Sequence, residues 1–397
     1  ERTPGSLART GAGAVPSLAG LGDPEDGLYE FQVDPLPDGV EDRRSVDVRD
    51  EFGIYEGNEA LLHAPDGRAP DAFPLRVTVE AVRGSRLRCA VAWEAVDSRG
   101  AVGGFLGRRR EGYALTELCN PVPYDREAAG VEAALDSFGD VLTGRHPLTF
   151  TDTAAAESRA MDPELNQEQE VAVEHALLAD DLFCIHGPPG TGKTRTVVEV
   201  VRRAVAAGRD VLVCADSNQA VDNVVVGSST ADRADERSLH AHAQHGSGEF
   251  TLRRLNARRS ASSMVRERYA GVDRRAEVVA ATNSSAATLS RTFDLVVVDE
   301  ATQATFTATC IPLSKGEKAV LAGDHRQLPP FSSTEEPPES AYGESLFEHV
   351  YAEGGVYEGV GVQLRTQYRM HREVVYFPNR RFYGGSLRTG RDVPALG

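Results

Sequence analysis

The feature that most constrains the fold is a glycine-rich loop between an apolar run and a helical pattern. The apolar run ends at Ile185 and is typical of a buried strand, while the pattern from Thr196 to Val205 is typical of a helix. Glycines allow successive backbone N–H groups to point at one anion, and the positive end of the helix dipole adds to that attraction. The stretch therefore predicts a phosphate-binding βα unit. Its loop has the spacing G-x-x-x-x-G-K-[ST] and consists of Gly187, Pro188, Pro189, Gly190, Thr191, Gly192, Lys193 and Thr194.

Four side chains predict the chemistry of this unit. The Lys193 ammonium would reach the β- and γ-phosphates of a nucleotide, and the Thr194 hydroxyl would bind Mg²⁺. An acidic pair, Asp299 and Glu300, ends the apolar run that begins at residue 293. Asp299 would hold the Mg²⁺, and Glu300 would polarise the water that attacks the γ-phosphate. A helix cap is the alternative explanation of the acidic pair.

Further apolar runs alternate with helical segments along the second half of the chain. They lie at 210–215, 277–282 and 318–322. This alternation predicts an α/β fold built on a parallel sheet. Gln169 precedes the glycine-rich loop, and its amide either pairs with adenine or lies on the surface. Gln327 follows the last run, and it is a candidate for hydrogen bonding to the γ-phosphate.

The N-terminal part of the chain has a different pattern. Residues 1–72 are rich in Gly, Pro, Asp and Glu, and we expect loops and short strands there. Alternation with a period of two at 75–80, 87–93 and 112–118 predicts a small antiparallel barrel or sheet within 73–120. Apolar residues at helical spacing follow within 121–161. The three arginines at 108–110 are either a solvated turn or a nucleic-acid contact.

Acidic residues dominate the charge balance, with 60 Asp and Glu against 43 Lys and Arg and a net charge of −17. This balance argues against nucleic-acid binding by the surface as a whole, because phosphates are held mostly by Lys and Arg. The strongest basic cluster is the arginine-rich stretch 253–275, which is either a solvated helix face or a binding patch. The acidic, lysine-poor composition suits a salt-rich cytoplasm. Complete folding in dilute buffer without any gain from molar KCl would contradict that hypothesis.

The sequence also predicts where the protein is located. No apolar run approaches the roughly 20 residues of a membrane span, and no signal-peptide pattern begins the chain. We therefore expect a soluble, cytoplasmic protein that does not bind membranes. Five cysteines are scattered without a C-x-x-C pair, which favours buried thiols in a reducing compartment over a metal site.

Ordered motifs along roughly residues 105–397 resemble those of superfamily 1 helicases. The resemblance is to the branch, 1B, that contains the nonsense-mediated decay helicase and the immunoglobulin mu-binding helicase. The matching motifs are LNQEQ at 165–169, GPPGTGKT at 187–194, VLVCADSNQAVDN at 211–223, DEATQA at 299–304, GDHRQLPP at 323–330, LRTQYRMH at 364–371 and FPNRRFYGGSL at 377–387.

The resemblance implies an ATP-driven motor that moves along single-stranded nucleic acid, usually 5′ to 3′, and separates duplexes. It implies a first RecA-like domain at 162–335 with a helical basic insertion at about 226–275, and the beginning of a second RecA-like domain at 336–397. It assigns adenine recognition to Gln169 and γ-phosphate coupling to Gln327. Tyr368 would stack on the base, and Arg369 would be an arginine finger. Along the nucleic-acid strand it would place Ser217, Asn218, Thr282 and Ser284.

Two positions depart from the pattern of this branch. Asp216 and Arg372 stand where related sequences commonly have proline, and Asp216 puts an acid beside the presumed strand path. Since the second RecA-like domain is incomplete, we expect a C-terminally truncated piece that alone binds and hydrolyses ATP weakly. The alternatives are a nucleic-acid-stimulated ATPase without unwinding, and a non-catalytic nucleic-acid-binding fragment of a disrupted gene. The choice between DNA and RNA stays open, and protein partners are unknown.

Overall fold

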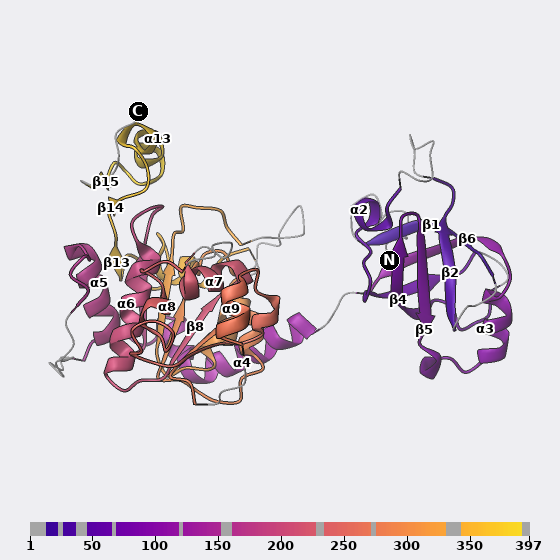
Figure 1. The fold of residues 1–397 in the computed structure, drawn as a ribbon, viewed down its shortest axis with the longest axis horizontal. Helices are drawn as coiled ribbons and strands as arrows, with labels where there is room; N and C mark the ends of the chain where they lie inside the picture. Colours follow the sequence, from indigo (N-terminus) through magenta and orange to yellow (C-terminus); the bar gives the residue numbers. More distant parts are fainter. Residues whose placement is uncertain are drawn as a thin grey trace. The chain divides into compact units, whose positions relative to one another are not determined.

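The structure of the chain, a computed structural model, describes residues 13–22, 27–36, 46–65, 69–118, 122–151, 161–227, 234–270, 275–330 and 343–390. The chain divides into two compact units, Glu1–Pro121 and Val122–Gly397. The first unit is built on a barrel of antiparallel strands, and the second is built on a parallel sheet with helices (Figure 1).

The barrel of the first unit is closed, with the strand order β1-β2-β5-β4-β3-β6. Inward-facing and outward-facing side chains alternate along its strands, as at Leu75, Val77 and Val79 of β4, which are buried. The rings of Phe31 and Tyr113 meet edge to face in the core, with their centroids 5.3 Å apart. The elements are β1 (Ala14–Gly20), β2 (Leu28–Val33), α2 (Val48–Phe52), β3 (Glu59–His63), β4 (Leu75–Arg83), β5 (Arg86–Val91), η2 (Trp93–Ala95), α3 (Arg99–Leu106) and β6 (Arg110–Glu117).

The barrel begins with β1 at Ala14, so the predicted boundary at residue 73 is wrong. The predicted strands at 75–80, 87–93 and 112–118 correspond to β4, β5 and β6, but β1, β2 and β3 also belong to the barrel. Closure depends on β1 pairing with β6, where Ala14 lies opposite Thr116. Such pairing joins segments that are distant in the sequence, so the local periodicity of residues 1–72 does not show it.

The second unit contains a sheet with the strand order β13-β7-β12-β11-β8-β10-β9, and every neighbouring pair is parallel. Alternate residues of β7 pack into different cores, with Phe183 and Ile185 on one face and Leu182 and Cys184 on the other. Side chains of α5, α6 and α7 complete the first core, and side chains of α4, α11 and α12 complete the second. The sheet is therefore covered on both faces, and the predicted α/β fold with a parallel sheet is confirmed.

The strands of this sheet are β7 (Leu182–His186), β8 (Val211–Ala215), β9 (Leu252–Arg254), β10 (Val278–Thr282), β11 (Leu295–Val298), β12 (Ala319–Gly323) and β13 (Val362–Gln363). The helices around it are α4 (Val122–Leu142), α5 (Gln167–Leu178), α6 (Lys193–Ala206), α7 (Asn218–Val226), α10 (Asn283–Ala286), α11 (Phe306–Leu313) and α12 (Leu346–Tyr351). After β13 the chain leaves the sheet. It then forms β14 (Thr366–Gln367), α13 (Arg372–Phe382) and β15 (Arg388–Thr389), which lie together in Figure 1.

The predicted helical insertion at about 226–275 is only partly helical. Its described residues form α8 (Leu239–His242), β9, the 3-10 turn η3 (Ala257–Arg259) and α9 (Ser263–Arg268). The difference arises because β9 pairs with β10 and becomes the edge strand of the sheet. Part of the insertion is therefore extended, because it forms a strand of the sheet.

Three further expectations concern the helix within 121–161, membrane spans and the cysteines. The helix expected within 121–161 is α4, which ends just before a turn at Gly144 with φ +69°. Among the described residues, the helices are all too short or too polar to cross a lipid bilayer. The thiols of Cys89, Cys184, Cys214 and Cys310 are buried, as predicted, and Cys119 lies outside the described residues.

Candidate nucleotide-binding site

The glycine-rich loop connects the carboxyl end of β7 to the beginning of α6. Gly190 and Gly192 have φ angles of +78° and +79°, in the left-handed region that favours glycine. The Thr191 hydroxyl donates to the carbonyl of Pro188 at 2.7 Å, so the loop is braced by its own hydrogen bonds. The helix α6 begins at Lys193, within the last two residues of the motif, and has 14 residues. The loop therefore has the left-handed glycines and the helix N-terminus that the sequence predicted.

Lys193 and Glu300 form an ion pair beneath this loop. The Lys193 Nζ atom lies 2.8 Å from Glu300 Oε2, and Lys193 is 7% exposed. Glu300 follows β11 in a left-handed conformation with φ +50°, which is unfavourable for a residue other than glycine. The fold thus holds the Glu300 carboxylate against the lysine assigned to the phosphates.

Thr194 and Asp299, the two residues assigned to Mg²⁺, also lie in contact. The Thr194 hydroxyl donates to Asp299 Oδ2 at 3.2 Å, and the backbone N–H of Glu300 donates to Asp299 Oδ1 at 3.0 Å. Burial raises the pKa of Asp299 to about 6, although the nearby Lys193 ammonium acts in the opposite direction. One hydroxyl and one carboxylate beside a phosphate-binding loop are oxygen ligands of the kind that Mg²⁺ takes. The donor set therefore fits the predicted ion.

Gln169 is buried, at 3% exposure, which excludes the surface position left open by the sequence. Its Oε1 accepts from the backbone N–H of Asn166, and the Asn166 side chain caps α5 in return. The Gln169 Nε2 atom donates to the carbonyl of Thr191 at 3.0 Å. In this structure the amide therefore joins the entrance of α5 to the glycine-rich loop.

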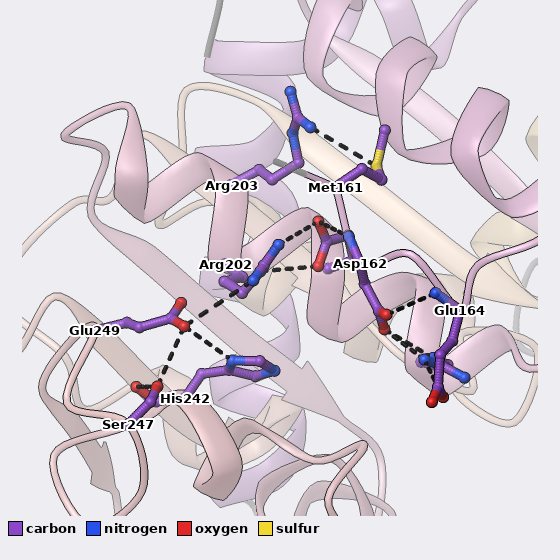
Figure 2. Close-up of polar contacts among 10 residues, drawn as sticks. Met161, Asp162, Glu164, Arg202, Arg203, His242, Ser247 and Glu249 are labelled. Carbon is purple, nitrogen blue, oxygen red and sulfur yellow. Dashed lines mark hydrogen bonds and ion pairs between the residues drawn. The ribbon is translucent and has the colours of Figure 1, made fainter. Parts of the chain in front are cut away.

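A polar cluster fixes that entrance against α6 (Figure 2). Asp162 forms an ion pair with Arg195 of α6 at 2.5 Å, and it accepts from the backbone N–H of Glu164 at 2.9 Å. Farther along α6, Arg202 lies 4.0 Å from Glu249 of the insertion, which is also 3.3 Å from His242. Figure 2 shows these contacts as one connected group, so α6 links the segment before α5 to the insertion.

Tyr368 and Arg369 lie on the glycine-rich loop, although they are far from it in the sequence. The Tyr368 backbone N–H donates to the carbonyl of Gly190 at 2.8 Å, and its hydroxyl accepts from the Asn166 amide at 2.9 Å. A Cβ atom placed on Gly190 would lie 2.6 Å from the Arg369 Cβ atom. The structure therefore brings the predicted stacking residue and the predicted arginine finger to the loop.

Gln327 is directed at Asp324, a buried residue that the sequence reasoning did not select. The Gln327 Nε2 atom donates to Asp324 Oδ2 at 2.9 Å. His186 and Tyr383 also contact the Asp324 carboxylate, at 3.0 Å and 2.8 Å. Burial raises the pKa of Asp324, but the hydrogen bonds from His186, Gln327 and Tyr383 outweigh that effect and lower it to about 2. The motif GDHRQLPP contains Asp324, so the sequence did mark its position.

Comparisons with known proteins show the family of the chain. Two family profiles, both described as an AAA domain, match residues 164–244 with 228–335 and residues 342–396, which together make up more than half of the chain. The chain is 32% identical over 350 residues to the DNA-binding protein SMUBP-2 of Rattus norvegicus. The chain belongs to branch 1B of the superfamily 1 helicases.

The alignments cover only part of each relative. The match to SMUBP-2 includes 72% of this chain and 34% of the relative, so the chain spans about a third of that protein. The ATP-dependent helicase NAM7 of Saccharomyces cerevisiae is 36% identical over 261 residues, with 58% of this chain and 26% of NAM7 covered. A solved Arterivirus nonstructural protein 10 (helicase) in complex with DNA has a TM-score of 0.40 and 13% identity, covering 92% of this chain and 64% of that one.

The residues expected along the nucleic-acid strand lie at the carboxyl ends of two strands of the parallel sheet. Ser217 follows β8 and caps α7, and Asp216 beside it is exposed. Thr282 ends β10 and caps α10, while the Ser284 hydroxyl accepts from Arg126 of α4 at 3.0 Å. These ends lie on one edge of the parallel sheet, the same edge as the glycine-rich loop.

The arginine-rich stretch 253–275 is not a single surface patch. Arg254 is 1% exposed and forms an ion pair with the buried Asp222 of α7 at 3.4 Å. Its guanidinium also donates to Asn218 Oδ1 at 2.7 Å. Arg258 and Arg259 are exposed. Arg254 therefore belongs to the interior, and Arg274 lies outside the described residues.

Two of the three arginines at the beginning of the last barrel strand, β6, also make contacts within their own unit. The Arg109 guanidinium donates to the carbonyl of Leu21 at 3.2 Å. The Arg110 guanidinium lies 4.4 Å from the centre of the Phe105 ring. These contacts favour the structural interpretation for Arg109 and Arg110, although Arg109, like Arg108, is exposed.

Proposed function

We propose that this chain is the motor part of an ATP-dependent helicase that hydrolyses ATP with Mg²⁺ and moves 5′ to 3′ on single-stranded nucleic acid. The observation that carries the proposal is the mutual contact of Lys193, Glu300, Thr194 and Asp299 at the ends of β7 and β11. A phosphate-binding cation, a hydroxyl and two carboxylates in one place are the parts that phosphoryl transfer to water requires. Membership of the helicase family supports the same conclusion.

The residues of the site divide this chemistry among themselves. Lys193 exchanges its contact with Glu300 for the β- and γ-phosphates, which releases the Glu300 carboxylate. Glu300 then orients the attacking water and accepts its proton. Thr194 and Asp299 would hold Mg²⁺, which would supply neutralisation of the phosphate charge.

Four further residues act around this centre in the proposal. Gln169 recognises adenine through its amide, which already contacts the loop at Thr191. Gln327 detects the γ-phosphate, and Arg369 stabilises the charge of the transition state as an arginine finger. Tyr368 stacks on the base. The position of Tyr368 and Arg369 against Gly190 supports both of their roles.

The domain plan follows from these roles. The first RecA-like domain, expected at 162–335, extends through β13, since α12 packs against its sheet and β13 pairs with β7. The segment that follows β13 begins the second RecA-like domain, which was expected from 336. The barrel is an accessory domain. We propose an intracellular location, which the buried thiols of Cys184 and Cys214 support. SMUBP-2 is named a DNA-binding protein, so DNA is the first strand to test.

The experiment measures ATP hydrolysis with and without single-stranded DNA or RNA over a KCl series. Strand-stimulated turnover is expected in the full-length protein and, weakly, in this chain alone. It should persist in Lys315→Ala, a control lysine between α11 and β12, and it should be lost in Lys193→Ala. Stimulation should fall as KCl rises, because each phosphate contact releases counterions on binding. Fluorescent duplexes with 5′ or 3′ single-stranded tails test polarity.

Each outcome has a separate meaning. Stimulated turnover without separation of either duplex would support a nucleic-acid-stimulated ATPase and contradict helicase activity. Nucleotide binding that is unchanged in Lys193→Ala would contradict the proposed location of the site. Separation of the 3′-tailed duplex alone would reverse the proposed direction.

A further inference from the structure

The Asp324 carboxylate joins three segments of the second unit. Asp324 follows β12 and is 0% exposed. On one side Oδ1 accepts from His186 Nε2 at 3.0 Å and from the Arg326 backbone N–H at 3.1 Å. On the other side Oδ2 accepts from Gln327 Nε2 at 2.9 Å and from the Tyr383 hydroxyl at 2.8 Å. His186 directly precedes the glycine-rich loop, and Tyr383 ends α13.

The two donors on Oδ2 are not equivalent. Gln327 lies on the exposed loop after β12, and its amide is the group proposed to meet the γ-phosphate. Tyr383 is half-buried, and its own backbone N–H donates to the carbonyl of Asn379 at 3.0 Å. Burial beside the Asp324 carboxylate raises the pKa of Tyr383, so the hydroxyl keeps its proton and remains a donor. Tyr383 is thus the fixed donor, and Gln327 is the one able to turn.

The energetics of a buried carboxylate make this difference important. A buried charged oxygen that loses its last hydrogen bond is strongly destabilised. If Gln327 were the only side-chain donor to Oδ2, turning towards a nucleotide would leave that oxygen without one. The Tyr383 hydroxyl prevents this loss. A cavity of about 410 Å³, lined among others by His186, His325 and Tyr383, lies next to the cluster and provides room for rearrangement.

We propose that Tyr383 is a positioning residue that holds Asp324 Oδ2 and thereby releases Gln327 to respond to the γ-phosphate. The proposal rests on the proposed function, because it takes Gln327 as the γ-phosphate contact. It also gives the segment around α13 a direct connection to the nucleotide, through Asp324 and Gln327. The position of α13 therefore influences whether the protein distinguishes ATP from ADP.

The test compares affinities for ADP and for a non-hydrolysable ATP analogue, both with Mg²⁺. Tyr383→Phe removes only the hydroxyl, and Tyr376→Phe is the matched control on the same helix, where Tyr376 is exposed. We expect Tyr383→Phe to weaken binding of the ATP analogue at least about tenfold, the factor that corresponds to a hydrogen bond to a charged group. Binding of ADP should stay at the wild-type value, and Tyr376→Phe should change neither affinity.

A double-mutant cycle with Gln327→Ala separates positioning from a general structural effect. If Tyr383 acts through Gln327, then Tyr383→Phe should have no further effect once Gln327 is alanine. The proposal is overturned if Tyr383→Phe binds both nucleotides like the wild type, if it weakens them equally, or if its effect persists in the Gln327→Ala background. A wild type that binds no nucleotide would instead contradict the proposed function, so the two failures are distinguishable.

Discussion

The ammonium of Lys193 and the carboxylate of Glu300 lie 2.8 Å apart, so the proposed phosphate-binding cation and the proposed general base neutralise each other in this structure. Lys193 is buried and Glu300 is 28% exposed at its side chain, which places the pair at the edge of the interior. Phosphate oxygens and Glu300 therefore compete for the same cation. Removing the Glu300 carboxylate should therefore raise the affinity for nucleotide and lower the rate of hydrolysis.

Replacing Glu300 with glutamine should separate these two effects. We expect Glu300→Gln to bind ATP more tightly than the wild type, because Lys193 loses its competing carboxylate. Turnover should fall about 10²–10⁴-fold, the contribution typical of a general base. Isothermal titration and a steady-state phosphate-release assay measure both quantities, with the exposed Glu317→Gln as control. Undiminished turnover in Glu300→Gln would show that another group activates the water.

The raised pKa of Asp299 predicts a pH-dependent effect on stability. Burial raises this pKa to about 6, above the value of about 3.9 for an unfolded chain. The folded protein therefore holds this proton more tightly, so the stabilisation is complete below the unfolded pKa and is lost as the pH rises through about 6. Asp299→Asn, which carries no charge at any pH, should raise Tm above pH 6 in protein without nucleotide.

Thermal unfolding from about pH 5 to pH 8 checks this prediction. The Tm advantage of Asp299→Asn should be constant well above pH 6 and shrink as the pH falls below about 6, while the exposed Asp136→Asn should show no such trend. The same variant should lose Mg²⁺-dependent binding of ATP. A Tm advantage that is constant across the range would mean that the Asp299 carboxyl does not titrate there.

The parts of the fold predictable from sequence were those with local periodicity. Short apolar runs that each end in polar residues predicted the strands β7, β8, β10, β11 and β12 and their parallel arrangement. The barrel was different, because its closure depends on pairs such as Leu18 with Tyr113, which no local pattern connects. The short edge strand β9 was not predicted, because its sequence, Leu-Arg-Arg, lies in an arginine-rich stretch and contains no apolar run.

The charge of a residue likewise did not predict its environment. Arg254 lies among eight arginines between residues 253 and 275, yet its guanidinium is enclosed by Asp222, Asn218 and the carbonyl of Leu255. Ser260 also donates to Asp222, so each oxygen of the carboxylate accepts a hydrogen bond. Only the folded chain distinguishes this arginine from exposed neighbours such as Arg258.

The stability of the protein should therefore depend on Arg254 and not on Arg258. Arg254→Met leaves the buried Asp222 without its counter-ion, and we expect a loss of about 3–5 kcal/mol in the free energy of unfolding. Arg258→Met changes an exposed side chain and should stay within about 0.5 kcal/mol of the wild type. Urea unfolding measures both values. Equal losses in the two variants would contradict the buried ion pair, and Asp222→Leu added to Arg254→Met should restore part of the stability.

The residues of the nucleotide site were predictable individually, but their contacts were not. The spacing of the loop marked Lys193 and Thr194, and the end of an apolar run marked Asp299 and Glu300. The contact of Tyr368 with Gly190 joins segments almost half a chain apart. Helical and strand periodicity contain no information on such distances, so the placement of the segment 366–370 on the loop required the structure.

That placement can be tested at Gly190. Gly190 and Gly208 have similar φ angles, +78° and +80°, so alanine at either position carries a similar conformational cost of about 1–2 kcal/mol. Their surroundings differ, because a Cβ atom on Gly190 would lie 2.6 Å from Arg369 Cβ, whereas one on Gly208 would have nothing within 4 Å. Gly190→Ala should therefore push the Tyr368–Arg369 backbone off the loop. We expect faster hydrogen exchange at the Tyr368 amide and loss of ATP hydrolysis in Gly190→Ala, with neither effect in Gly208→Ala. Unchanged exchange at Tyr368 in Gly190→Ala would mean that this segment does not rest on the loop in solution.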